Sequence, residues 1–195
     1  DQDEIQFASV KSVGRKRMIR RVHTLLDNAD VVVHYNGLKF DIPTLSKEFV
    51  KLGLLPPSPY KQVDLMQVCK QAFRFESNKM AFVVEALGLK AQKRSNEGFK
   101  LWVKCMNGDP EGWKNMEIYN RGDVESLGEL YHRLLPWIRK HPNLSAHREV
   151  LCCPKCGSHD YQSRGEMLTT TLRYKRFQCK KCGHVVRQAE GSGNK

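Results

Sequence analysis

Apolar and polar positions in the first half of the chain follow patterns typical of both strands and helices. Val31–Tyr35 is a nearly continuous apolar run, which predicts a strand covered on both faces in a sheet with parallel strands. Glu4–Val10 alternates as a half-buried strand does, and Arg15–Asn28 has the spacing of an amphipathic helix. The same reading predicts a helix over Ile42–Leu52, a short strand near Gln62-Val63, and a helix over Leu65–Phe73 with Asp64 as its N-cap.

Helical spacing dominates after about residue 75. The expected helices cover Lys79–Leu87, Phe99–Met106, Glu111–Asn120 and a long stretch from Asp123 to about Lys140. A polar segment, Lys140–Glu149, then has the composition of a linker. We therefore expect an α/β domain over residues 1–144 and a small second domain over residues 151–188.

The charge balance changes this picture by indicating an anionic partner. The chain has 33 basic and 21 acidic residues, a formal charge of +12, and nucleic acid is the natural candidate. The alternative is a basic protein whose charge serves solubility alone. No apolar run approaches the length of a membrane span, and the first residues lack the basic-then-apolar order of a secretory signal, so a cytoplasmic protein is expected.

Five of the seven cysteines gather near the C-terminus, four of them in two copies of one motif. Cys153 and Cys156 form the first CxxC pair and Cys179 and Cys182 the second, each followed by glycine. Two such turns supply the four thiolates of a closed tetrahedral zinc site, and the segment resembles a zinc ribbon. Redox-active CxxC pairs are the alternative, but they use a βαβ context that is missing here. Cys152 would break the two-residue spacing and is left out of the predicted site.

The predicted ribbon is also strongly basic. Residues 151–195 contain nine Lys or Arg and three Asp or Glu, so this short segment carries a net charge of +6. Rings and cations alternate in its central stretch, which can contact phosphates with the cations and stack bases on the rings. The alternative is that the rings only form the small core of the ribbon. The candidate nucleic-acid-binding residues are Arg173, Tyr174, Lys175 and Arg176.

Two acidic residues in the larger domain are candidates for chemistry. Asp41 follows an Asn36-Gly37 turn at the end of the apolar strand, and taken alone it is better explained as a helix N-cap. Tyr119 and Asp123 are four residues apart and therefore share one face of a helix. Asp123 taken alone is compatible with an ordinary solvated acid or a helix cap.

Together these residues resemble the second and third motifs of the DEDD superfamily of 3′→5′ exonucleases, in its tyrosine subclass. The motifs are Asn36-Gly37 with Phe40-Asp41, and Y-x-x-x-D at Tyr119 and Asp123. The resemblance implies a ribonuclease H-like mixed sheet with flanking helices and cleavage of nucleic acid, most simply DNA, with two Mg²⁺ or Mn²⁺ ions about 4 Å apart. It further implies that Asp41 and Asp123 are metal ligands, that Tyr119 orients the water or the scissile phosphate, and that Asn36 shapes the turn and contacts the substrate.

The family's first motif, D-x-E at the end of the first strand, is missing ahead of Asp41. Asp109-Pro110-Glu111 and Asp123-Val124-Glu125 have the letters but lie downstream of the second motif. The chain does not start with methionine, so we expect truncation of the N-terminal strands and little nuclease activity from these 195 residues alone. Two alternatives remain: a degenerate nuclease fold that binds nucleic acid or protein partners, and another ribonuclease H-like activity such as internal RNA cleavage.

Overall fold

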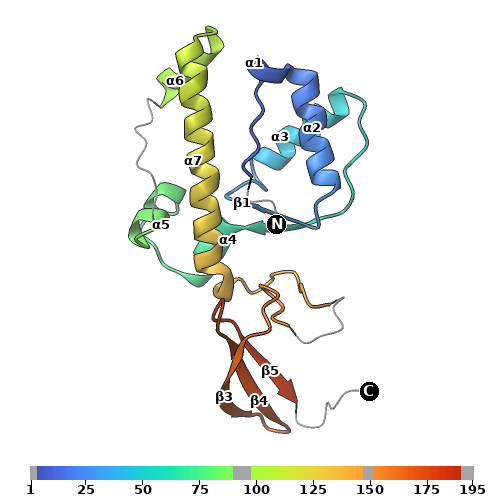
Figure 1. The fold of residues 1–195 in the computed structure, drawn as a ribbon, viewed down its shortest axis with the longest axis vertical. Helices are drawn as coiled ribbons and strands as arrows, with labels where there is room; N and C mark the ends of the chain where they lie inside the picture. Colours follow the sequence, from blue (N-terminus) through green and yellow to red (C-terminus); the bar gives the residue numbers. More distant parts are fainter. Residues whose placement is uncertain (1–3, 90–97, 147–151, 190–195) are drawn as a thin grey trace. The chain divides into compact units, whose positions relative to one another are not determined.

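The computed structural model describes residues 4–89, 98–146 and 152–189, which form two compact units (Figure 1). The first unit comprises Asp1–Tyr131 and the second His132–Lys195. The sequence analysis assigned residues 132–144 to the larger domain, whereas in the structure they belong to the compact unit that contains the cysteine pairs.

A parallel pair of strands forms the sheet of the first unit. β1 (Val31–His34) pairs with β2 (Lys61–Asp64), with Val31 opposite Lys61 and His34 opposite Asp64. A parallel pair requires a crossover, and α3 (Asp41–Lys51) provides it. The predicted strand at residues 31–35 and the short strand near residue 62 are thus confirmed, each within one or two residues at its ends.

A buried apolar cluster holds the helices of this α/β region against the sheet. α2 (Arg15–Asp27) contributes Ile19 and Leu26, and α3 contributes Phe49. Val32 of β1 packs against them, so the cluster joins both helices to the strand. The amphipathic spacing of residues 15–28 predicted a core face with Met18, Ile19, Val22, Leu25 and Leu26. Ile19 and Leu26 are buried as expected, whereas Leu25 is exposed.

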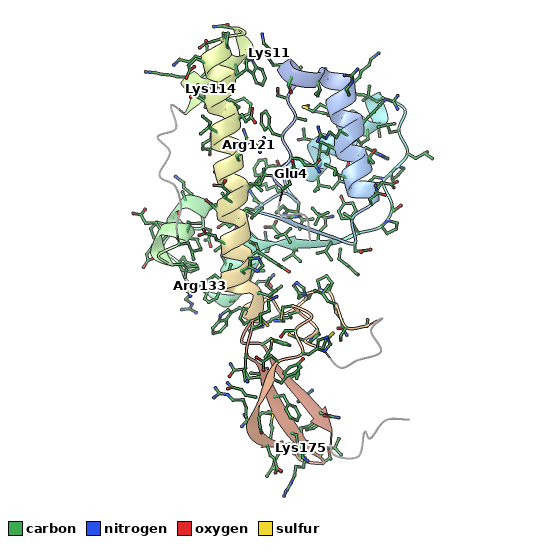
Figure 2. The ribbon with its side chains drawn as sticks, in the orientation of Figure 1. Glu4, Lys11, Lys114, Arg121, Arg133 and Lys175 are labelled. Carbon is green, nitrogen blue, oxygen red and sulfur yellow. The ribbon has the colours of Figure 1, made fainter. Side chains whose placement is uncertain are left out.

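The N-terminal segment is not the strand that its alternation predicted. Residues 4–9 have no strand partner among the described residues, and Val10–Val13 forms a short helix, α1. Ser9 caps α1, because its hydroxyl accepts from the Ser12 N–H at 3.0 Å while the Ser12 hydroxyl accepts from the Ser9 N–H at 3.0 Å. The extended residues are held instead by Arg121, whose Nη1 donates to the Ile5 carbonyl at 2.7 Å (Figure 2).

The remaining helices of the first unit follow the predicted order, with one merger. α4 (Leu65–Ala72), α5 (Met80–Ala86) and α6 (Phe99–Met106) lie where helices were expected. The two helices predicted around residue 121 are one helix, α7 (Pro110–Leu134). A single glycine in a helix costs about 1 kcal/mol, too little to break it, whereas Pro136 ends the α-helical geometry just beyond α7.

The second unit is a small antiparallel sheet beside the two CxxC turns. β3 (Tyr161–Leu168), β4 (Arg173–Cys179) and β5 (Val185–Ala189) pair in that order. η1 (Leu135–Trp137) belongs to the same unit, and buried Lys155 joins it to the first CxxC turn. The Lys155 ammonium donates to the carbonyls of Leu135 and Pro136 at 3.1 and 2.8 Å. The predicted fold class, an α/β domain plus a small zinc-ribbon-like unit, is confirmed.

Candidate functional site

The turn after β1 depends on Asn36, which has an unusual backbone conformation, and on Gly37, which lies where a side chain would not fit. Asn36 has φ 62°, in the left-handed region that asparagine and glycine tolerate better than other residues. Gly37 is buried, and a Cβ there would lie only 2.7 Å from Cγ of the His34 ring. The Gly37 carbonyl accepts from the Ile42 N–H at 2.9 Å, so this turn fixes the start of α3, where Asp41 lies.

Asp64, at the end of β2, holds the same turn from the neighbouring strand. Its Oδ1 accepts from the N–H of Asn36 at 2.9 Å and from the N–H of Met66 at 3.0 Å. The predicted N-cap of α4 is therefore confirmed, and the bond to Asn36 is a second role that the sequence did not reveal. This role depends on the parallel register that places the carboxyl end of β2 beside that of β1.

The second carboxylate oxygen of Asp64 is buried and has no hydrogen-bond partner among the described residues. It lies 3.8 Å from His34 Nδ1, a contact that is an ion pair only if the ring is doubly protonated. Nδ1 already accepts from the Gly37 N–H at 3.1 Å, so the ring proton is on Nε2, which donates to Gln62 Oε1 at 3.1 Å. Two acceptors thus face each other beneath the turn.

A cleft of about 470 Å³ opens beside this turn within the first unit. Asn36, the predicted substrate-contacting residue, lines it together with two lysines, Lys39 and Lys70. Phe40 also lines the cleft and is 58% exposed, with the Lys39 ammonium 5.7 Å from the centre of its ring. The cleft therefore combines a polar turn, two cations and an open aromatic ring, features that suit a nucleotide chain.

Asp41 is the first residue of α3 and is exposed. The N-cap position is occupied by Phe40, without a side-chain capping bond, so the alternative explanation of Asp41 as the N-cap is wrong. Its carboxylate lies in the first turn of the helix, where the partial positive charge of the free N–H groups favours an anion.

Tyr119 and Asp123 interact on one face of α7, as their spacing predicted. The Tyr119 hydroxyl donates a hydrogen bond to the Asp123 carboxylate. Burial raises the pKa of Asp123 above its ordinary value, and the hydrogen bond from Tyr119 offsets part of that shift. A carboxyl group whose charge is disfavoured by burial is a common feature of metal-binding and catalytic sites.

The other D-x-E sequence in the chain has a structural role. The Asp109 carboxylate accepts from the Glu111 N–H at 3.1 Å, at the start of α7. Within the described ranges, neither Asp41 nor Asp123 belongs to a group of three or more possible metal ligands. The D-x-E at Asp109 therefore caps a helix and does not supply the missing first motif.

The four predicted cysteines come together in the second unit. The sulfurs of Cys153, Cys156, Cys179 and Cys182 all lie within 4.8 Å of one another, and the pairs 153/182 and 156/179 are 3.6 Å apart. A tetrahedral site with Zn–S bonds of about 2.3 Å requires sulfurs about 3.8 Å apart, so the four thiolates fit a metal such as zinc. Cys152 is buried but outside this group, as predicted.

The glycines that follow the two CxxC pairs have positive φ. Gly157 has φ 69° and Gly183 φ 78°, and their N–H groups each donate at 2.8 Å to the carbonyl of the first cysteine of their pair. These tight turns bring the two sulfurs of each pair to the same side of the loop.

The four candidate nucleic-acid-binding residues of β4 lie on two faces of the small sheet. Side chains alternate along a strand, so Tyr174 and Arg176 share one face while Arg173 and Lys175 share the other. Arg173 pairs with Glu166 of β3 at 3.3 Å, which neutralises part of the second face. The guanidinium of Arg187, a residue of β5 that the sequence analysis did not single out, lies over the Tyr174 ring at 5.0 Å.

The parallel strand pair with its crossover helix forms an α/β fold that is compatible with the ribonuclease H-like class. A family model described as RNase_H superfamily matches residues 2–135, more than half of the chain. The chain therefore belongs to the RNase H superfamily, a nuclease-type fold, and this membership implies nucleic acid as its partner. No curated protein and no solved structure matches the chain. None of the described helices is both long and apolar enough to span a membrane.

Proposed function

We propose that this chain carries part of the active site of a metal-dependent 3′→5′ exonuclease that hydrolyses phosphodiester bonds of nucleic acid, most simply DNA. The observation that carries the proposal is the pairing of Tyr119 with a half-buried Asp123 of raised pKa in a chain of the RNase H superfamily. Asp41, at the exposed start of α3, is the second proposed ligand.

Carboxylates suit the chemistry because Mg²⁺ and Mn²⁺ prefer oxygen ligands. When bound, two such ions supply an activated water and stabilise the leaving 3′-oxygen. In this chain, Asp41 and Asp123 would hold the ions, and the Tyr119 hydroxyl would keep Asp123 oriented and donate toward the water or the scissile phosphate. This role requires the ionised form of the Asp123 carboxyl group, which nearby cations would favour.

The cleft beside the Asn36-Gly37 turn is the proposed substrate site. Its two lysines can contact phosphates, and Asn36 can donate or accept a hydrogen bond at its floor. The proposed structural zinc, held by the four cysteines, maintains the ribbon, whose residues Arg173, Tyr174, Lys175 and Arg176 provide additional contacts with nucleic acid.

A second function, binding of nucleic acid without hydrolysis, is favoured by one specific observation. The 195 residues contain no D-x-E at the end of an apolar strand ahead of Asp41. They therefore supply only two of the four carboxylates that the resemblance to DEDD exonucleases implies. Two carboxylates bind a pair of divalent ions weakly, and we expect little hydrolysis from these residues alone.

The test uses labelled single-stranded DNA and RNA, with Mg²⁺ or Mn²⁺, and compares this chain with the protein translated from its whole reading frame. The exonuclease proposal predicts mononucleotide release from the 3′ end by the latter. Asp41→Asn and Asp123→Asn should each reduce the rate by about a hundredfold or more, because each removes a metal ligand. Glu125→Gln, at an exposed position on α7, is the matched control and should retain the wild-type rate.

Binding of the same strands is measured in parallel without divalent ions. Variants that lose hydrolysis but keep wild-type affinity support the assignment of the two aspartates. Full activity in either aspartate variant contradicts the exonuclease site, and binding without hydrolysis by every form of the protein supports the second function.

A further inference from the structure

One face of the small sheet brings two arginines directly opposite each other. Arg176 of β4 is the register partner of Arg187 of β5 in an antiparallel pair, so their side chains lie on the same face. Tyr174 shares this face, two residues before Arg176. We call the face formed by Tyr174, Arg176 and Arg187 the arginine face.

Neither arginine is neutralised within the described part of the chain. No carboxylate there pairs with Arg176 or Arg187, and the Nε of Arg176 is buried without an acceptor. Two other cations of this unit differ, because Arg173 pairs with Glu166 at 3.3 Å and Lys180 with Asp160 at 3.0 Å. The two arginines without a carboxylate partner thus lie together on one face.

Like charges directly opposite each other on a sheet destabilise the pairing of the strands. An anion placed between the two guanidinium groups replaces their mutual repulsion with two attractions. A phosphate suits this position because its oxygens can accept hydrogen bonds from both guanidinium groups at once. The Tyr174 ring holds the Arg187 guanidinium in place at 5.0 Å, which reduces the entropy lost when the arginine binds a ligand. The geometry of the free protein is therefore already arranged for a bridging anion.

We propose that the arginine face is a phosphate-backbone site for nucleic acid, in which Arg176 and Arg187 bind successive or shared phosphates of one strand. This inference rests on the proposed nucleic-acid function but not on hydrolysis. It assigns a role in nucleic-acid binding to Arg187. Arg173 and Lys175, on the opposite face, should contribute less to the affinity for nucleic acid.

The site reads the backbone and not the bases. One side of the Tyr174 ring is covered by Arg187, and Phe177 lies on the other face of β4, so the two rings do not form a common stacking surface. The cross-strand bond from Gln162 to Gln178, at 3.1 Å, places further polar groups beside the arginines. Binding should therefore be independent of sequence and steeply dependent on salt.

The experiment measures the affinity of the full chain for a mixed-sequence 20-nucleotide DNA strand and the matching RNA strand, by fluorescence anisotropy over a range of salt concentrations. All proteins carry Asp123→Asn and no divalent ion is added, so the substrate stays intact. Arg176→Gln/Arg187→Gln is compared with Arg173→Gln/Lys175→Gln, which removes the same charge from the same strand region of the other face.

The arginine-face variant should bind about tenfold more weakly, with a salt slope lower by about 1.4, the value for two phosphate contacts on a single strand. The opposite-face variant should lose less than about threefold. Equal losses in the two variants, or an unchanged slope in the arginine-face variant, overturn the proposal. Competition by polyglutamate as strong as by the unlabelled strand overturns it too, because it shows that any polyanion binds.

Zinc content measured with a chromogenic chelator checks that each variant keeps the ribbon folded. If the double variant loses zinc, the single substitutions Arg187→Gln and Arg173→Gln, both at exposed positions, are compared instead. Arg187→Gln should then bind the strand at least about threefold more weakly than Arg173→Gln. Binding through this face, with no hydrolysis by the protein translated from the whole reading frame with Mg²⁺ or Mn²⁺, disproves the exonuclease proposal only. A protein that hydrolyses nucleic acid, with affinity unaffected by either arginine substitution, disproves this inference only.

Discussion

Asp64 provides the sharpest test of how the turn ahead of Asp41 is held. The Asp64 side chain is 3% exposed, and its Oδ1 accepts the N–H groups of Asn36 and Met66 at 2.9 and 3.0 Å. Asp64→Ala removes both acceptors, while Asp64→Asn keeps Oδ1 and replaces only the oxygen that has no partner among the described residues. The two substitutions therefore separate the hydrogen bonds from the charge.

Asp64→Ala should destabilise the first unit by about 2–4 kcal/mol. Loss of the cap of α4 accounts for about 1 kcal/mol, and the N–H of Asn36 left unsatisfied beneath the turn adds about 1–3 kcal/mol. Asp64→Asn should stay within about 1 kcal/mol of the wild type. The substitution loses about 0.3–1 kcal/mol of interaction between the Asp64 charge and the helix dipole. In exchange, it replaces Oδ2, the acceptor that faces the acceptor Nδ1 of His34, with an N–H donor.

The assay is urea unfolding of the zinc-loaded chain, followed by the helical circular dichroism signal, because α2 to α7 dominate it. The ribbon, whose unfolding is followed separately by zinc release, should be unaffected and serves as an internal control. If Asp64→Asn destabilises the protein as much as Asp64→Ala, the negative charge and an ion pair with His34 hold the turn, and our assignment of the His34 proton to Nε2 is wrong.

Three further predictions concern the turn, the buried acid and the metal. Gly37→Ala should lower the free energy of unfolding by about 1–3 kcal/mol, because its Cβ would lie 2.7 Å from the His34 ring. Gly128→Ala is the control in the same urea titration: its Cβ would have no atom within 4 Å, so it should stabilise α7 by about 0.5–1 kcal/mol. Burial raises the pKa of Asp123, so this group favours folding at low pH and loses that contribution as the pH rises through its folded pKa. Asp123→Asn should therefore be at least as stable as the wild type at pH 7. A clear loss of stability of this variant at pH 7, measured by calorimetry, would contradict the prediction. Chelation of zinc should abolish amide protection in β3 to β5 and leave that of α2 unchanged; protection of both without metal contradicts a structural zinc site.

The strand and helix pattern of the first unit was largely predictable because burial follows local sequence there. The run of β-branched residues at Val31–His34 and the helical spacing that buries Ile19, Leu26 and Phe49 are both visible in the sequence. Residues 4–9 show the limit of this approach: their alternation suits a strand, but a strand also needs a partner, and the chain supplies Arg121 and a Ser9 cap instead. Pairing partners distant in sequence are not encoded in local periodicity.

The candidate site was predictable where spacing determines geometry. The i, i+4 relation of Tyr119 and Asp123 and the two CxxC pairs each fix a local contact, and both contacts form. The role of Asp64 in holding Asn36 was not predictable, because it depends on the parallel register of β1 and β2. Arg187 was missed for the same reason, since its register partner lies on another strand.

Binding and chemistry are assigned to different kinds of residues, and this makes them separable by experiment. The affinity of a basic protein for nucleic acid comes mainly from phosphate contacts and falls steeply with salt, whereas hydrolysis depends on a few carboxylates that add negative charge where the substrate is also negative. Neutralising Asp123 should therefore leave affinity equal or higher while removing catalysis, and neutralising Arg176 and Arg187 should weaken binding without changing the chemical step at saturating substrate. If Asp123 lies beside the substrate as proposed, its charge repels the phosphates in the absence of metal, so the proposal requires divalent cations or another positive group to complete the site.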